Sequence, residues 1–191
     1  MLILTLKQGK ERLVLAGDPL IYVSAIERVE GKFYEQKKFG ATCLVRASDQ
    51  TFLARAAWSP ASQVRARVWS LDESEAIDHA FFKRRIKLAI SKQLPLKKQS
   101  NNPQRLINAE EDGLPGLVVE YHAVLNGFLV CQFQAAGVDA WKVPIVKALI
   151  AETGCANVYE HTNYLIRKGE GLPVRSGVLA GEEPPANLRG T

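Results

Sequence analysis

Residues 57–70, AWSPASQVRARVWS, contain a turn signal followed by a run in which two kinds of side chain alternate. Successive side chains of a strand point to opposite faces, so the pattern places Arg65, Arg67 and Trp69 together on one face. A guanidinium group can contact phosphate through two N–H groups, and an indole offers a face on which a base can stack. That face is therefore a candidate nucleic-acid surface. In the structural alternative, Trp69 is buried where two domains meet and an arginine is paired with an acid.

The residues before this strand predict a small β-barrel. Their β-rich runs are short and are separated by breaks that contain Gly, Pro or Asp, a spacing typical of small barrels. The expected strands are LILTL at 2–6, RLVLA at 12–16, LIYVSAI at 20–26, ATCLVRA at 41–47, TFLARAAW at 51–58 and QVRARVW at 63–69. We therefore expect residues 1–72 to form one compact barrel with little helix.

A helix and a linker are expected over residues 73–104. Apolar residues recur at helical spacing in IDHAFFKRRIKLAISKQL at 77–94, after a cluster of acidic residues. Acids at the start of a helix suit its dipole, and Pro95 ends the helix because it lacks an amide donor. The linker LPLKKQSNNPQ then leads to the second half of the chain.

This connecting region is strongly basic. Residues 83–105 carry eight Lys and Arg residues and no acid, whereas the net charge of the whole chain is +5. Such a one-sided block is typical of a surface that binds a polyanion. The candidate contacts are Lys83, Arg84 and Lys87 on one side of the helix, and Lys97 and Lys98 in the linker. A solvated helix face is the plainer alternative.

Residues 105–180 predict a small α+β domain. Strands are expected at 116–122 and 127–134, followed by a helix over 139–154 that ends at Gly154. The runs ANVYEH and NYLIRK predict two further strands. The order strand, strand, helix, strand, strand indicates a sheet covered by one helix, so the chain as a whole is predicted to be α+β. Residues 181–191 remain as a tail.

Composition and motifs argue against several other classes of protein. Cys43, Cys131 and Cys155 are odd in number and far apart, and no C-x-x-C or H-x-x-x-H spacing occurs, so we expect free thiols and no metal. Gly169-Glu170-Gly171 is the only G-x-G, and the Pro- and Gly-rich sequence after it does not predict the helix that a nucleotide loop needs. We expect a cytoplasmic protein without membrane contact, because no apolar run is long enough for a membrane span.

No catalytic residue can be assigned from the sequence. The three histidines have no evident partner that would make them general bases. Glu110, Glu111 and Asp112 could be paired carboxylates or metal ligands, but they lie among turn signals in RLINAEEDGLPG and close to the basic block. A turn whose acids offset nearby positive charge is the favoured interpretation.

Several segments resemble one known family, the large-subunit ribosomal RNA cytosine-C5 methyltransferases that depend on S-adenosylmethionine. These segments are SPASQVRARVWSLDES, IDHAFFKRRI, RLINAEEDGLPGLVVEYH, QFQAAG and IRKGEGLP. The resemblance covers nearly the whole chain and implies a PUA RNA-binding barrel over 1–72, a central α+β domain over 105–180 and a methyltransferase domain that would begin at 181–191. Residues 15–22, LAGDPLIY, depart from the Arg-rich segment and His-Pro-Trp-Val-Phe that are usual there.

The resemblance implies the RNA-binding, substrate-positioning N-terminal part of such a methyltransferase. Structured ribosomal RNA would be the partner, and the implied contacts are Arg65, Arg67, Trp69, Lys83, Arg84, Lys87, Lys97 and Lys98. The catalytic and cofactor domain is expected beyond residue 191, so we expect no cofactor in this chain and no catalytic role for its cysteines. The alternative is a stand-alone interaction module that docks on a separate catalytic chain or a ribosomal protein. It predicts an exposed apolar patch near the C-terminus.

Overall fold

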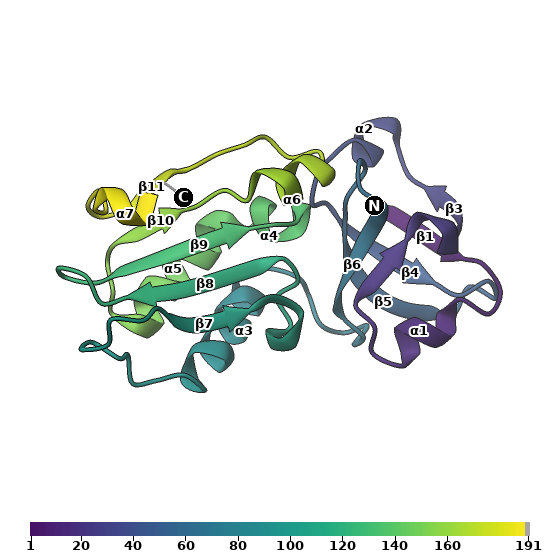
Figure 1. Ribbon diagram of the computed structural model, residues 1–191. Coiled ribbons are helices and arrows are strands. Elements are labelled where there is room, and N and C mark those ends of the chain that lie inside the picture. The colour runs from purple at the N-terminus through teal and green to yellow at the C-terminus, as the bar shows by residue number, and fades with distance from the viewer. Residues whose placement is uncertain (190–191) are drawn as a thin grey trace.

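The computed structural model describes residues 1–189, and the last two residues of the predicted tail, 190–191, lie outside this range. It contains two β-sheets, one in each half of the chain (Figure 1). Each sheet has its own apolar core. The mixed architecture agrees with the predicted α+β class.

The first half is a six-stranded sheet in the order β2-β6-β5-β4-β1-β3. Its strands are β1 (Leu2–Leu6), β2 (Leu20–Tyr22), β3 (Ile26–Glu30), β4 (Thr42–Arg46), β5 (Phe52–Trp58) and β6 (Val64–Ser70). Strands β1 and β4 run parallel, and the other neighbours are antiparallel. The alternating pattern of β4 shows why the sequence folds this way, since Cys43 and Val45 point into the core and their neighbours do not.

Two predicted strands of this half are wrong. RLVLA at 12–16 forms the short helix α1 (Glu11–Leu15), which buries only Val14 and ends before Gly17 at φ +95°. A helix of one turn is too short to show a helical period, and its apolar residues therefore imitate a strand. The expected strand 20–26 is divided into β2, the 3-10 turn η1 (Val23–Ala25) and β3. A further short helix, α2 (Phe33–Gln36), follows β3.

The predicted connecting helix is confirmed as α3 (His79–Ser91). The Asp78 carboxylate caps its start by accepting a hydrogen bond from the Phe81 amide at 2.9 Å. One side of α3 buries Phe81, Phe82 and Ile86, and the opposite side carries the basic residues. The helix ends before Pro95, as that proline requires.

The second half is a five-stranded sheet in the order β11-β10-β9-β8-β7. Its elements are β7 (Gln104–Asn108), η2 (Ala109–Asp112), β8 (Leu117–His122), β9 (Phe128–Phe133), α4 (Ala136–Ala140), α5 (Lys142–Thr153), β10 (Val158–Glu160), α6 (Tyr164–Gly169), β11 (Gly177–Ala180) and α7 (Ala186–Arg189). Helices α3 and α5 pack together behind the sheet (Figure 1). The predicted stop at Gly154, with φ +72°, is confirmed.

The predicted strand order of this half needs correction. NYLIRK forms helix α6 instead of a strand, because the Asn163 side chain caps its first turn by accepting from the Ile166 amide at 3.2 Å. Strand β7 was hidden by the turn signals that follow it in RLINAEEDGLPG, and β11 was not predicted at all. The expected single helix over 139–154 is α5 preceded by the separate helix α4, with Trp141 between them.

The two halves meet through close backbone packing. A Cβ atom on Gly137 of α4 would lie 2.5 Å from the Ala57 Cβ and 2.7 Å from a ring carbon of Trp69. A Cβ atom on Gly40, in the first half, would lie 2.6 Å from the Ala140 Cβ. Only glycine fits at these two positions, one contributed by each half, so at the junction the backbone of each half lies directly against atoms of the other.

Candidate nucleic-acid interface

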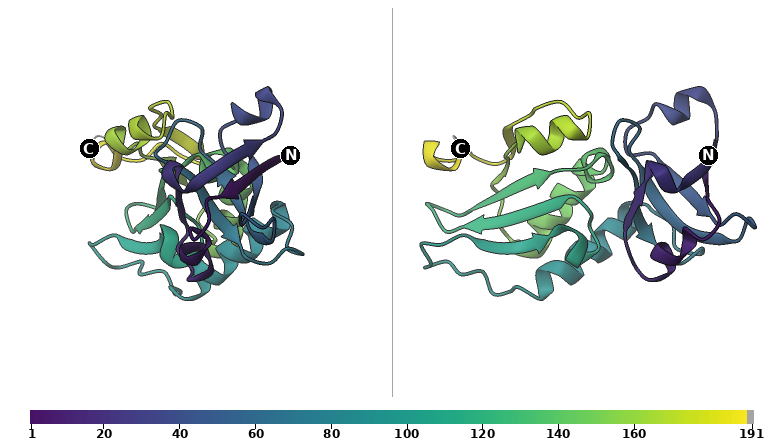
Figure 2. Two further views of the ribbon diagram at one scale, coloured as in Figure 1. Left: turned by 90° about the vertical axis from the view of Figure 1, so that its right-hand side faces the viewer. Right: turned by 45° about the vertical axis from the view of Figure 1, so that its right-hand side comes forward.

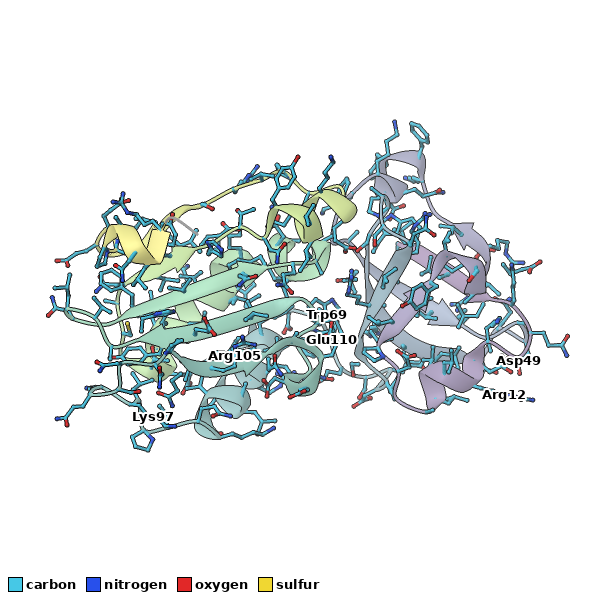
Figure 3. The ribbon with its side chains drawn as sticks, in the orientation of Figure 1. Arg12, Asp49, Trp69, Lys97, Arg105 and Glu110 are labelled. Carbon is cyan, nitrogen blue, oxygen red and sulfur yellow. The ribbon has the colours of Figure 1, made fainter. Side chains whose placement is uncertain are left out.

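Trp69 lies in the junction between the halves (Figure 3). Its side chain is 2% exposed and belongs to the core of the second half. The rings of Phe82 and Phe81 meet it edge to face, with centroids 5.1 and 5.9 Å away. In this position the indole offers no face on which a base could stack.

An irregular register accompanies this placement. The pairing of β5 with β6 shifts between Arg55 and Ala56, so that Ser70 faces Arg55 and Val68 faces Ala56, leaving Trp69 opposite the irregularity. Such an extra residue re-aims a side chain next to it. Simple alternation of side chains therefore does not describe the C-terminal end of β6.

Arg67 is paired with an acid from the other half of the chain. Its Nη1 lies 2.5 Å from Oε1 of Glu170, and the two side chains are only 14% and 8% exposed. The Ser62 hydroxyl donates to the second oxygen of Glu170. Arg65 donates from Nε to the Ser62 carbonyl at 3.1 Å, and its guanidinium lies 5.8 Å from the centre of the Trp58 ring. The burial of Trp69 and the pairing of Arg67 with an acid match the structural alternative stated for this strand. RNA contact by Arg65, Arg67 and Trp69 stays a prediction.

Arg85 and Glu170 are junction residues that the sequence did not single out. Arg85 donates to the Trp69 carbonyl at 2.8 Å and to the Gly113 carbonyl at 2.7 Å, and it lies over the Phe81 ring. Burial lowers the pKa of its guanidinium, although Glu75 opposes that shift. Glu170 lies 103 positions from Arg67, so no local pattern could have paired them.

The basic residues of the connecting region have a different environment. Lys83 and Lys87 on α3 are exposed, as are Lys97 and Lys98 in the linker. None of these four lysines forms an ion pair with any residue in the range 1–189. Arg84 is exposed too, but its Nη2 lies 3.2 Å from the Glu75 carboxylate. Lys97 lies at the end of the second half that is far from Trp69, so the eight candidates do not form one surface (Figure 3).

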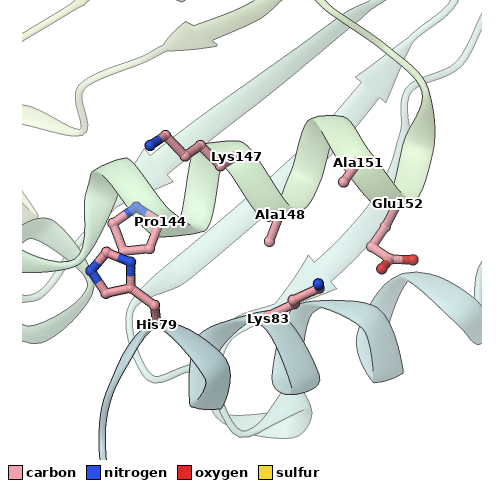
Figure 4. Close-up of a pocket in the computed structure, with 7 residues that line it drawn as sticks. All are labelled: His79, Lys83, Pro144, Lys147, Ala148, Ala151 and Glu152. Atoms are coloured by element: carbon pink, nitrogen blue, oxygen red, sulfur yellow. The ribbon is translucent and has the colours of Figure 1, made fainter.

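A shallow depression lies between α3 and α5 beside Lys83 (Figure 4). Its lining includes His79 and Lys83 of α3 and Pro144, Lys147 and Glu152 of α5, with His79 lying beside Pro144. Two lysines and one carboxylate leave this depression net positive, which suits a phosphate group. In the described range 1–189, no group of three or more His, Cys, Asp or Glu is arranged to hold a metal ion.

The three thiols are free and buried. Burial raises the pKa of the Cys43 thiol to about 12, and burial likewise raises the pKa values of Cys131 and Cys155. A nucleophilic cysteine needs the thiolate form at neutral pH. These residues therefore act as small apolar side chains in the two cores. Of the helices in residues 1–189, none is long and apolar enough to span a bilayer.

Comparisons with known sequences point in one direction. Residues 4–71 match the model of a PUA-like domain. Ribosomal RNA large subunit methyltransferase I of Aeromonas salmonicida is 42% identical over 180 residues, which is 94% of this chain and 44% of that protein. The Aliivibrio fischeri protein of the same name is 39% identical over 184 residues, 96% of this chain and 45% of its own length. The chain thus spans less than half the length of the curated relatives it matches.

Solved structures share the fold at lower identity. A putative SAM-dependent methyltransferase from Streptococcus mutans superposes with a TM-score of 0.72 at 17% identity, over 97% of this chain and 44% of that one. A putative methyltransferase complexed with SAH gives the same values. At this identity the likeness shows the fold alone.

These findings contradict the expectation that this chain itself holds no cofactor. A solved protein that matches 97% of the chain is complexed with SAH, and another is described as SAM-dependent. Gly169-Glu170-Gly171 does not fit such a group, because it lies at the C-terminal end of α6 and its amides do not begin a helix.

Sequence identity and fold thus agree. Residues 4–71 form a PUA-like domain, and over nearly its whole length the chain is homologous to ribosomal RNA large subunit methyltransferase I.

Proposed function

We propose that this chain is the RNA-binding, substrate-positioning part of an S-adenosylmethionine-dependent ribosomal RNA (cytosine-C5) methyltransferase. The observation that carries the proposal is its 42% identity over 94% of its length to a ribosomal RNA large subunit methyltransferase. The N-terminal position of this part and the cytosine-C5 specificity derive from the resemblance of its motifs. The predicted cytoplasmic location stays a prediction.

The exposed lysines support the choice of RNA as the ligand. Lys83, Lys87, Lys97 and Lys98 have no acidic partner within residues 1–189, so a phosphate can approach them without displacing a carboxylate. Contacts of this kind fix the orientation of RNA without reading its sequence. The proposed role of this face is to orient a folded RNA, while Arg67 and Trp69 support the junction from inside.

Salt-dependent binding tests the proposal. Lys83→Ala/Lys87→Ala in the 191-residue chain removes two of the exposed charges, and fluorescence anisotropy with a folded fragment of large-subunit ribosomal RNA measures affinity across salt concentrations. The slope of log K against log salt is negative, and each lost phosphate contact reduces its magnitude by roughly 0.7–0.9, so a reduction of up to about 2 is expected. Lys7→Ala/Lys10→Ala removes equal charge from exposed positions in the first half and is the matched control. An unchanged slope for the α3 variant would remove this face from the interface.

A second function has one observation in its favour. Five exposed apolar side chains lie between residues 164 and 178, in the region toward the C-terminus where the docking alternative expects an exposed apolar patch. They are Tyr164, Leu165, Ile166, Val174 and Val178. Such a patch suits contact with a catalytic domain or a separate protein. Capture of a methyltransferase chain that survives nuclease treatment and is lost in Leu165→Glu would support docking, and capture that depends on RNA would count against it.

A further inference from the structure

A second cluster of cations and aromatic rings lies in the first half, on and around α2. The segment 32–39, KFYEQKKF, contains three lysines, three aromatic residues and one acid. Phe33 is 74% exposed and Tyr34 is 67% exposed. Helix α2 projects from the rest of the first half in both views of Figure 2. Two adjacent rings exposed to this degree require an explanation, because burial would normally be favoured.

These rings do not hold the segment in place. Helix α2 buries none of its residues. It is anchored instead by polar contacts, among them the Trp58 indole N–H donating to the Gln36 carbonyl at 2.8 Å and the Gln36 side chain donating to the Gly31 carbonyl at 3.0 Å. Phe33 and Tyr34 are therefore exposed without contributing to a buried core.

The charge of the segment is also available. Glu35 is its only acid, and this carboxylate accepts from the Lys32 amide at 3.0 Å and pairs with the Met1 amine at 2.8 Å. The hydrogen bond from the Met1 amine, with that from Lys32, holds the pKa of Glu35 below its usual value. Lys32 and Lys37 form no ion pair in the part of the chain that the structure describes.

The lysines lie over the rings. The Lys37 Nζ is 4.1 Å from the centre of the Phe33 ring, and the Lys32 Nζ is 5.9 Å from that of Tyr34. Beside them, Phe33, Lys37 and Phe39 line a shallow depression that Pro60 and Ala61 complete. Cations and ring faces therefore alternate along one open surface. We name it the α2 surface, consisting of Lys32, Phe33, Tyr34, Lys37, Lys38 and Phe39.

We propose that the α2 surface binds single-stranded RNA, with bases stacked on Phe33 and Tyr34 and phosphates held by the neighbouring lysines. Exposed rings interleaved with cations are the usual platform for unpaired nucleotides. A protein partner fits less well, since lysine is depleted in the cores of protein interfaces. The inference rests on the proposed function for its ligand class, and it adds a separate site and an RNA without base pairs.

Two RNAs and two variants test this site in the 191-residue chain. The probes are a labelled oligoadenylate, which is single-stranded, and a labelled hairpin from large-subunit ribosomal RNA. Phe33→Ala/Tyr34→Ala should weaken oligoadenylate binding roughly tenfold for each ring and leave hairpin binding within about twofold. Lys83→Ala/Lys87→Ala should do the reverse. Phe33→Trp/Tyr34→Trp should preserve or strengthen oligoadenylate binding, a rescue that a merely structural role would not give.

The outcomes separate the two proposals. If the unmodified chain binds neither RNA, the proposed function fails. If it binds the hairpin, and oligoadenylate binding is absent or unaffected by Phe33→Ala/Tyr34→Ala, only the α2 site is overturned. Unfolding curves confirm that the variants are folded, which is expected because α2 buries none of its residues.

Discussion

In β6, Arg67 and Trp69 point into the contact between the two halves, where one is paired with Glu170 and the other is packed against Phe82. In α2, Phe33 and Tyr34 point into solvent with lysines over their faces. Both segments combine cations with aromatic rings in the sequence. Only in the first of them does another part of the chain cover these side chains; Phe33 and Tyr34 of the second stay exposed.

This difference shows that what a face could bind and whether that face is exposed are separate questions, although one sequence pattern suggests an answer to both. Alternation along β6 states which side chains share a face, and composition states what that face could bind. Neither states whether a distant segment covers it. Here α6 and the residue after it bring Glu170 to Arg67 across 103 positions, so Arg67 takes part in a contact within the chain that no local pattern announces.

The largest effect is expected for Trp69→Ala, which tests whether the β6 side chains support the fold. Loss of a fully buried indole should lower the free energy of unfolding by about 3–5 kcal/mol, because its ring fills the space between the halves. Urea unfolding measures this loss. Trp69→Phe is the control and should cost less, since the indole N–H has no hydrogen-bond partner within residues 1–189. If the Trp69→Ala protein is as stable as the unmodified chain but binds RNA more weakly, Trp69 contacts RNA and does not act mainly in packing.

Glu170→Ala tests the other junction residue. It leaves the largely buried Arg67 guanidinium unpaired, so the free energy of unfolding should fall by about 2–3 kcal/mol. Combining it with Arg67→Ala should cost less than the sum of the two single changes by about 1 kcal/mol or more. Additive effects in this double-mutant cycle would show that the pair contributes nothing.

The smallest effect is expected for the α2 surface. Phe33→Ala/Tyr34→Ala should change the free energy of unfolding by no more than about 0.5 kcal/mol, because neither ring is packed in a core. The same urea titration measures it. A loss comparable with that of Trp69→Ala would mean that these rings support the fold, and the contrast between the two segments would disappear.

The sequence predicted the elements whose signals are local. The apolar period of α3, the stop at Gly154 and the alternation in β4 all follow from neighbouring residues. Helix α6 was misread as a strand although Asn163, a common N-cap, stood directly before it. Strand β7 was missed because turn residues follow it immediately.

The candidate site was less predictable. The exposed lysines of α3 could be anticipated, since the helical period separates them from Phe82 and Ile86. The burial of Trp69 depends on an irregular register in β6 and on packing from α3 and α4, none of which is encoded nearby. The α2 surface was overlooked because its segment lies between strands and resembled an ordinary polar connection.

The glycine contacts at Gly40 and Gly137 restrict how the two halves can move relative to each other. At each glycine, atoms of the other half lie too close to leave room for one additional methyl group. A change in the angle between the halves would displace atoms in proportion to their distance from this contact, so the linker around Lys97, far from Trp69 (Figure 3), would move more than the α2 surface, whose Phe39 adjoins Gly40. The position of the linker lysines relative to the first half is thus fixed by the smallest residues in the contact.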